Sequence, residues 1–537
     1  MTVLSVAGLT VRLPPGADRP RALDAVSLDV AAGEVLCLVG ESGSGKSMLA
    51  SAILRLLPPG TAVAGGAIRL DGQDLLALPE RAMRAIRGPR IGMVFQDAMT
   101  ALNPLHRVGD QVAEPFRTHT DLKTAAIRAR VLSLFEQVGL PDPPGVARAY
   151  VHQLSGGQRQ RVGIAMALAL EPELLIADEP TTALDVTTQA QVLALMRDLQ
   201  RRRGTALLFV THDFGVVAEI ADRVAVLQQG VLVEQGAAET VLTRPNHPYT
   251  RALIAAVPPL TPAPPRPVSP DAILQAEGLG KTFRSGGWRA RRAVHALDGV
   301  SVTLPRGATM GVVGESGSGK STLARCLLQL LPLDAGTVVL DGADLLRLPR
   351  RAASKRIQMV FQDPYASLNP RRRVGELVAQ GPMVHGMARA PAMAKARELL
   401  SLVALPPEAA DRFPHEFSGG QRQRVALARA LALEPEVLVA DEPVSALDVS
   451  VQAQVLALLA DLRARLGLSM VFVTHDLRVA GRICDRIVVM RGGRVVEEGT
   501  AEDVFLRPRD PYTQALLAAV PGRGWTPAGT GTGQPSP

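Results

Sequence analysis

One ordered set of short motifs occurs twice in this chain, and this repeat limits the possible folds more than any other feature. The duplicated motifs are GESGSGKS at 40–47 and 314–321, SGGQRQRV at 155–162 and 418–425, ADEP at 177–180 and 440–443, and VTHD at 210–213 and 473–476. The copies lie 274 residues apart at the first motif and 263 apart from the second onward, so only loop lengths differ. A chain of 537 residues also exceeds one ordinary core. The sequence therefore predicts a duplicated domain.

The domain boundaries follow from composition. Residues 258–270, PPLTPAPPRPVSP, are so rich in proline that they favour a semi-rigid spacer over a helix or a central strand. We predict one domain at 1–257, a linker at 258–271, and a second domain at 272–521. The last residues, 522–537, have the composition of a disordered tail.

Composition narrows the class of protein only slightly. The net charge of +8 suits a nucleic acid or an anionic membrane equally, while the aromatic content of 3% argues against a base-stacking surface. The three cysteines form no CxxC pair, so no disulfide framework or zinc site is expected. We find no signal-peptide pattern and no run near the roughly 18 apolar residues of a membrane span. We therefore expect a cytoplasmic location.

Short apolar runs alternate with helical stretches in each half. The runs at 35–40, 174–178 and 207–211 lead into functional motifs, which is typical of a parallel sheet covered by helices. Residues 223–236 read as two strands around Gln229-Gly230, hence a hairpin, and 97–160 reads as a separate helical lobe. The predicted class is α/β.

The motif GESGSGKS predicts a phosphate-binding loop. Its glycines let backbone N–H groups face phosphate oxygens, and the start of the next helix adds positive potential. We expect the lysines to reach the β- and γ-phosphates of ATP and the serines to bind Mg²⁺. The predicted residues are Gly40, Gly43, Gly45, Lys46 and Ser47, and Gly314, Gly317, Gly319, Lys320 and Ser321. A chance match explains one such loop more easily than two.

Acidic and amide side chains end other apolar runs. Asp178 and Asp441 are placed to hold Mg²⁺, and Glu179 and Glu442 follow as candidate general bases. A plain helix N-cap is the competing interpretation of each acidic pair, since a proline follows it. His212 and His475 are candidates to orient the catalytic water, although a lone histidine is more often structural. Gln96 and Gln362 could bridge Mg²⁺ and that water.

Taken together, these motifs resemble the ATP-binding-cassette ATPases. The phosphate loop, VFQD, the signature SGGQ, ADEP, SALD or TALD, and THD follow one another in both halves. The resemblance implies two nucleotide-binding domains, each with a phosphate-loop core, an antiparallel β subdomain and a helical subdomain. It also implies that each ATP lies between the phosphate loop of one domain and the signature of the other. The signature residues are Ser155, Gly157 and Gln158, and Ser418, Gly420 and Gln421.

The resemblance also concerns adenine and the symmetry of the two sites. Phe283 is the candidate to stack on adenine in the second half, whereas Leu13 is the aligned residue in the first. Neither half lacks the catalytic carboxylate or the histidine, so both sites are expected to hydrolyse ATP.

A further resemblance concerns the type of transporter. Both halves end with matching extensions, RPNHPYTRALIAAVP at 244–258 and RPRDPYTQALLAAVP at 507–521, and both carry LNP after VFQD. These features resemble the ATPases of dipeptide, oligopeptide and nickel importers, especially the fused ATPases of glutathione and microcin C importers. This implies peripheral attachment to the cytoplasmic face of the inner membrane, two permease subunits and an extracytoplasmic solute-binding protein. Because neither extension contains a cysteine, no iron–sulfur cluster is expected.

Three other tandem-cassette proteins are less consistent with the sequence. A translation factor would have a long charged helical linker, and a DNA-repair ATPase would have zinc-binding cysteine clusters. A fused sugar-importer ATPase would lack the HPYT-type extensions. We therefore expect no nucleic-acid partner, with a soluble cassette ATPase acting on nucleic acid as the alternative.

Overall fold

Two compact units make up the computed structural model. The first comprises Met1–Val257 together with Pro521–Pro537, and the second comprises Pro258–Val520. The structure describes residues 1–537 except 97–100, 182–183, 286–291, 446 and 527–537. Parts of the TALD and SALD motifs and of the loop after Gln96 therefore lie outside the described residues.

Two sheets form the centre of the first unit. The antiparallel sheet has the order β2-β1-β4-β5, and the larger sheet has the order β10-β9-β3-β8-β7-β6. Their strands are β1 (Thr2–Arg12), β2 (Arg21–Ala31), β4 (Ala62–Leu70), β5 (Gln73–Asp74), β3 (Val35–Val39), β6 (Ile91–Val94), β7 (Leu174–Asp178), β8 (Ala206–Thr211), β9 (Arg223–Gln228) and β10 (Val231–Ala237). In the larger sheet only β10 is antiparallel to its neighbour. The core fills the space between these sheets, with buried residues from both and from α1 (Lys46–Ile53).

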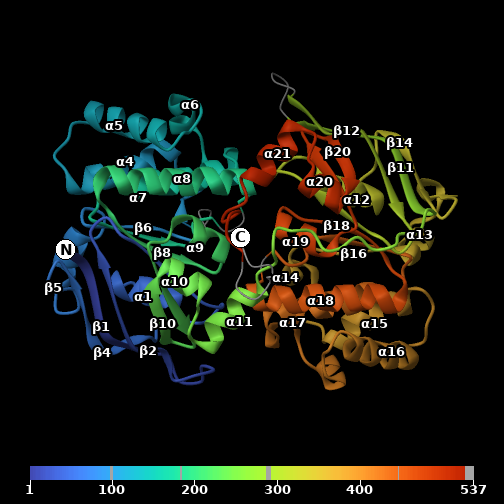
Figure 1. The fold of residues 1–537 in the computed structure, drawn as a ribbon, viewed down its shortest axis with the longest axis horizontal. Helices are drawn as coiled ribbons and strands as arrows, with labels where there is room; N and C mark the ends of the chain where they lie inside the picture. The colour runs from blue at the N-terminus through green and yellow to red at the C-terminus, as the bar shows by residue number, and fades with distance from the viewer. Residues whose placement is uncertain (97–100, 182–183, 286–291, 446, 527–537) are drawn as a thin grey trace, which may run out of the picture. The chain divides into compact units, whose positions relative to one another are not determined.

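The helices of the first unit divide into two groups. Among the described residues, the helices of the helical lobe lie on one side of the unit, away from β1, β2 and β4 (Figure 1). They are α4 (Val108–His119), α5 (Thr124–Gln137), α6 (Pro143–Arg148) and α7 (Gly156–Ala167). The others are α2 (Glu80–Ile86), α8 (Val186–Arg203), α9 (Phe214–Ile220), α10 (Ala238–Thr243) and α11 (Pro248–Ala256), with a 3-10 turn at Val151–Gln153.

The second unit repeats this arrangement. Its sheets have the orders β12-β11-β14-β15 and β16-β17-β18-β13-β19-β20. The strands are β11 (Ala272–Ser285), β12 (Arg292–Pro305), β14 (Ala335–Leu340), β15 (Ala343–Asp344), β16 (Ile357–Val360), β17 (Val437–Asp441), β18 (Ser469–Val473), β13 (Thr309–Val313), β19 (Arg486–Arg491) and β20 (Arg494–Thr500). The helices are α12 (Lys320–Leu327), α13 (Arg350–Arg356), α14 (Pro364–Ser367), α15 (Val374–Val384), α16 (Arg389–Leu402), α17 (Gly419–Leu431), α18 (Val449–Leu466), α19 (Leu477–Ile483), α20 (Ala501–Leu506) and α21 (Pro511–Ala518). Short 3-10 turns lie at Leu345–Arg347, Pro407–Asp411 and Pro414–Glu416.

These elements confirm the predicted α/β class with its parallel core, antiparallel β subdomain and helical lobe. The hairpin predicted at 223–236 is β9 and β10, which pair antiparallel with Gln228 opposite Val231. Gln229 and Gly230 both have positive φ, at 47° and 88°, as a two-residue turn between twisted strands requires. Among the described residues, no helix is long and apolar enough to cross a membrane.

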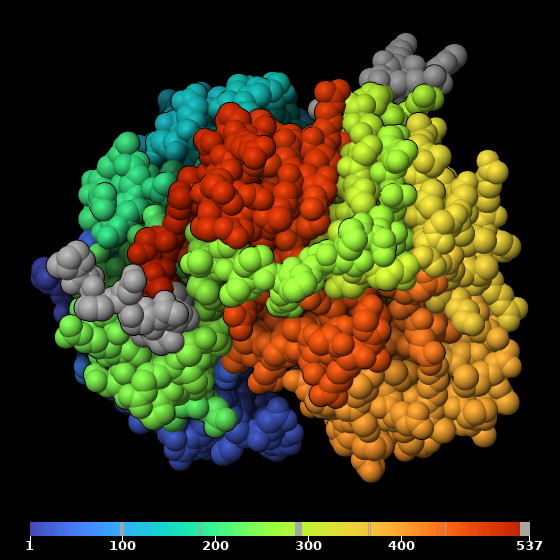
Figure 2. All heavy atoms as spheres, turned by 45° about the vertical axis from the view of Figure 1, so that its right-hand side comes forward, coloured from blue at the N-terminus to red at the C-terminus, as the bar shows by residue number. Residues whose placement is uncertain are grey.

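Two segments without helix or strand pack against the folded units. The linker contains no helix or strand from 258 to 270, yet it packs on the second unit and runs across its surface as an extended segment (Figure 2). In the predicted disordered tail, Gly522 is buried and its N–H donates to Glu219 Oε2 at 3.2 Å. Glycine and proline here form a packed turn, which composition does not distinguish from disorder.

Candidate active site

The phosphate loop of each unit lies between a buried strand and a helix. It follows β3 or β13 and leads into α1 or α12, whose N-caps are Gly45 and Gly319. These two glycines have φ values of 110° and 107°, a conformation that side chains rarely adopt. A Cβ on Gly45 would also lie 2.7 Å from Ala22 O. The loop therefore needs glycine there both for its turn and for space.

The loop lysines lie over this turn. Lys46 Nζ donates to Gly40 O at 2.7 Å and to Glu41 O at 2.9 Å. Lys320 makes the same contacts with Gly314 O and Glu315 O at 2.7 and 2.8 Å. Both lysines are buried, so each ammonium is held inside the loop where phosphates would bind.

A serine and an aspartate meet beside each loop. Ser47 Oγ lies 3.1 Å from Asp178 Oδ1, and Ser321 Oγ lies 3.1 Å from Asp441 Oδ1. Burial raises the pKa of both aspartates above its ordinary value, although the serine hydrogen bonds oppose that shift. A buried carboxylate beside a hydroxyl is the hard oxygen pair that Mg²⁺ takes together with nucleotide phosphates. These residues therefore fit the predicted ion.

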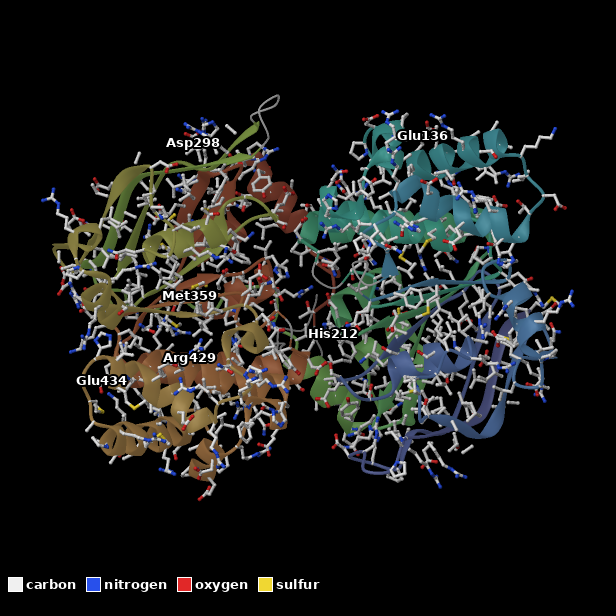
Figure 3. The ribbon with its side chains drawn as sticks, turned by 180° about the vertical axis from the view of Figure 1, so that it is seen from behind. Glu136, His212, Asp298, Met359, Arg429 and Glu434 are labelled. Carbon is white, nitrogen blue, oxygen red and sulfur yellow. The ribbon has the colours of Figure 1, made fainter. Side chains whose placement is uncertain are left out.

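The catalytic candidates of the first unit converge on Glu179. Its carboxylate accepts from Gln96 Nε2 at 3.0 Å and lies 3.2 Å from His212 Nδ1. The backbone N–H of Glu179 donates to Val210 O at 2.9 Å, which ties it to β8. His212 follows the end of β8 and is labelled in Figure 3. Glu179 has a φ of 46°, an uncommon value for a side chain other than glycine and one that occurs at functional sites.

The second unit has the same arrangement around Glu442. Gln362 Nε2 donates to its carboxylate at 2.8 Å, His475 Nδ1 lies 3.1 Å away, and φ is 47°. Burial alone would raise the pKa of Glu442, but the hydrogen bond and charge of His475 lower it below its ordinary value. Burial alone would lower the pKa of His475, but Glu442 raises it. The pair is thus stabilised as a carboxylate beside an imidazolium.

The signature residues begin the last helix of each helical lobe. Ser155 and Ser418 are the N-caps of α7 and α17, and their Oγ atoms accept from the N–H groups of Gln158 and Gln421, both at 3.3 Å. The two glutamines accept in return from the serine N–H groups. Each signature is therefore a closed capping box with its serine exposed.

The adenine candidates differ between the halves. Phe283 on β11 is 42% exposed, and the Lys281 ammonium lies 5.9 Å from its ring centroid. Leu13 follows β1 and packs partly against the core. Only the second unit therefore presents an aromatic ring at this position.

Sequence reasoning missed one pair of residues at the phosphate loops. Tyr249 Oη accepts from Glu41 N at 3.2 Å, and Tyr512 Oη accepts from Glu315 N at 3.0 Å. Both tyrosines belong to the PYT motif of the extensions. In the sequence this motif indicated only a resemblance to importer ATPases and no contact with the phosphate loop. The repetition of PYT in both halves was the available signal.

Comparisons with known proteins identify the family of the chain. Residues 23–182 and 297–445 match the ABC transporter family, and residues 233–289 and 496–528 match the oligopeptide/dipeptide transporter C-terminal region. The chain is 48% identical over 530 residues to a peptidoglycan transport ATP-binding protein, YejF, of Agrobacterium fabrum, covering 96% of each chain. It is 46% identical over 561 residues to a glutathione import ATP-binding protein, GsiA, of Pectobacterium atrosepticum, covering 97% of this chain and 89% of that one.

A solved structure matches part of the chain. The ATP-binding cassette MJ0796, bound to ADP and Pi, is 30% identical, and the match covers 42% of this chain and 98% of the solved one with a TM-score of 0.39. The family assignment rests on the sequence matches over both halves and on the relatives that cover nearly the whole chain. The chain therefore belongs to the ABC transporter ATPases, in the fused two-cassette type with the oligopeptide/dipeptide transporter C-terminal region.

Proposed function

We propose that this ATPase powers the uptake of a peptide-like solute through two permease subunits supplied with solute by an extracytoplasmic binding protein. The observation that carries this proposal is the complete catalytic set in both cassettes together with the duplicated extension. The relatives named for peptidoglycan transport and glutathione import support a solute of this class. The proposed location is the cytoplasmic face of the inner membrane.

In the proposed mechanism, Glu179 and Glu442 polarise the water that attacks the γ-phosphate. The contacts of Glu179 with Gln96 and His212 hold its carboxylate in one orientation, and Glu442 is held in the same way. Lys46 and Lys320 neutralise phosphate charge. Ser47 with Asp178, and Ser321 with Asp441, would hold Mg²⁺, which supplies charge neutralisation at the β- and γ-phosphates when bound. The role of each signature in completing the other cassette's site stays a prediction.

A groove in the first cassette is the proposed permease contact. It has a volume of about 360 Å³ and lies between the helical lobe and the sheet. Its lining includes Met93, Phe95, Met166, Leu170, Glu114 and His119. Phe95 directly precedes Gln96 and is 43% exposed, so an apolar helix bound here would contact the neighbour of a catalytic residue.

Membrane attachment tests this function. We expect the protein to sediment with membranes only when its permeases are co-expressed, and to stay bound in moderate salt because the contact is mainly apolar. Phosphate-driven binding to nucleic acid would instead weaken steeply with salt. Phe95→Glu should reduce attachment, whereas Val231→Glu, at a residue of similar exposure on β10, should not. Activation of ATPase by ribosomes or DNA without permeases would contradict the proposal.

A further inference from the structure

The extension helices α11 and α21 each carry a tyrosine as their second residue, and this tyrosine contacts a phosphate loop. The hydroxyl oxygen of Tyr249 accepts a hydrogen bond from the backbone N–H of Glu41, and that of Tyr512 accepts one from Glu315. Both glutamates are the second residue of their phosphate loop. Tyr512 is buried, with 8% of its surface exposed, and Tyr249 is half-buried. The backbone N–H groups of this loop are the groups that bind phosphates, so a hydrogen bond to one of them restrains the shape of the binding loop.

The chain before each helix fixes the tyrosine in place. Glu234 on β10 accepts from the N–H groups of Asn246 and His247 at 2.7 and 3.1 Å. The N–H of Tyr249 then donates to His247 Nδ1 at 3.2 Å, which caps α11. In the second unit Glu497 and Asp510 make the corresponding contacts, with Tyr512 N 2.7 Å from Asp510 Oδ1. Each extension is therefore anchored to the hairpin of its own cassette.

The segment after α21 belongs to the first unit, where it packs on α9. Pro521 and Gly522 are buried, and Gly522 N donates to Glu219 Oε2 on α9. A Cβ on Gly215 would lie 2.8 Å from Pro521 O. A Cβ on Gly522 would lie 2.7 Å from Gly215 O. The two backbones thus approach so closely that only glycine fits on either side.

The segment after α11 makes the equivalent contact in the second unit, on α19. Arg478 Nη1 donates to Pro258 O at 3.4 Å, and Ala263 N donates to Gly481 O at 2.8 Å. Arg478 occupies the position of Gly215 in the repeat, 263 residues further along. The same Val-Pro dipeptide, 257–258 and 520–521, therefore marks the point at which the chain passes from one unit to the other.

Both contacted helices start next to the catalytic histidines. Asp213 follows His212 and caps α9 through the N–H groups of Gly215 and Val216, at 2.8 and 3.4 Å. Asp476 follows His475 and caps α19 in the same way. A shift of the first turn of either helix would therefore move its histidine relative to the catalytic glutamate.

We propose that each extension is a positioning element that links the phosphate loop of its own cassette to the histidine of the other. A change in the shape of the phosphate loop would move the tyrosine that is bonded to it. The Val-Pro segment after the extension helix would pass this movement to α9 from the second cassette and to α19 from the first. Binding of ATP at one cassette would thereby adjust the catalytic geometry of the second.

The first test loosens one segment in the full-length chain. Gly522→Val should displace the segment from α9, because Gly522 has a φ of 63° and no room for a Cβ. We expect hydrogen exchange in residues 214–220 to rise about tenfold and kcat to fall, with KM for ATP changed less than about twofold. Gly524→Val is the matched control, since nothing lies within 4 Å of its Cβ position.

The helix α19 provides an internal comparison for that test. Its contacts come from the intact linker, so its exchange should stay unchanged in Gly522→Val. Equal acceleration in α9 and α19 would indicate general destabilisation and overturn the proposal, as would unchanged exchange in α9.

The second test addresses the link itself. Tyr512→Phe removes only the hydroxyl at the second phosphate loop, and it should weaken ATP binding there about two- to tenfold. It should also raise hydrogen exchange in α9 of the first unit. Tyr150→Phe, in the helical lobe, serves as the control. Weaker ATP binding without any change in α9 would show that the two contacts act separately, and would refute the link.

A cross-link tests the contact directly. A Cβ on Gly522 would lie 3.2 Å from Ala218 Cβ on α9, so the next residue, the exposed Arg523, lies within reach of Ala218. A short bifunctional thiol reagent should therefore join Ala218→Cys to Arg523→Cys while Gly522 stays intact. The native cysteines, Cys37, Cys326 and Cys484, are all buried and should not interfere. We expect an intramolecular cross-link that is absent from the pair Glu136→Cys with Arg523→Cys. Equal cross-linking in both pairs, or none in the first, would overturn the proposed packing.

Discussion

At the scale of single residues, the two glutamates proposed as catalytic, Glu179 and Glu442, are held by matching contacts. Each carboxylate contacts one glutamine and one histidine, and each backbone lies in the left-handed region. Such a backbone persists only where surrounding contacts impose it. The N–H bonds from Glu179 to Val210 O and from Glu442 to Val473 O supply part of that restraint. The two halves therefore show no structural sign of a degenerate site in the residues described.

This symmetry predicts the behaviour of two single variants. Glu179→Gln and Glu442→Gln should each lower ATP turnover about 10²- to 10⁴-fold, because each removes a positioned base. ATP binding should persist, since the phosphate loops are untouched. Steady-state ATPase assays and measurement of trapped nucleotide check both points.

Glu136→Gln is the control for these variants. Glu136 is an exposed residue of α5 in the helical lobe (Figure 3), so its loss of charge should leave turnover unchanged. Near-normal turnover in one catalytic variant, with the other inactive, would show that the two sites are not equivalent.

At the scale of elements, close packing sets the position of each signature helix. A Cβ on Gly157 of α7 would lie 2.5 Å from Thr188 Cγ2 on α8, and one on Gly420 of α17 would lie 2.2 Å from Val451 Cγ1 on α18. The signature glycine thus has a packing role in each unit besides any contact with nucleotide.

We therefore predict that Gly157→Ala destabilises the protein even without ATP. Overpacking should cost about 1–3 kcal/mol in the free energy of unfolding, which exceeds the helix preference for alanine. Thermal unfolding without nucleotide measures the effect. Gly156→Ala should be neutral or slightly stabilising, because nothing lies within 4 Å of its Cβ position. Adding Thr188→Ser to Gly157→Ala should restore most of the loss, and failure to do so would argue against the clash.

At the scale of the whole molecule, one chain carries two complete motif sets. Both phosphate loops, both signatures and both glutamates proposed as catalytic are present in a single polypeptide. A second copy of the chain is therefore not needed to provide a second cassette.

This predicts the composition of the transporter. Native mass measurement of the purified complex should give one copy of this chain with two permease subunits. Two copies of this chain per complex would contradict the prediction. The measurement requires only co-expression of the chain with its permeases.

The sequence alone determined the duplication, the α/β class and the residues that meet around each glutamate. Phosphate loops and acidic residues at strand ends can be recognised in the sequence because each consists of a few consecutive residues. The family resemblance implied that Gln96, Glu179 and His212 share one site, and parallel strands that end at the same edge of a sheet bring them together. The structure adds the distances between them and the unusual backbone of the glutamate.

Only the tertiary structure decided which residues support these sites from far away in the chain. Tyr249 meets Glu41 across 208 residues, and Gly522 meets Glu219 across 303. Nothing in the local pattern of PYT or of a Gly- and Pro-rich tail specifies such partners. Long-range contacts of this kind depend on how folded elements pack and on which unit a connecting segment joins. These properties arise only when the whole chain has folded.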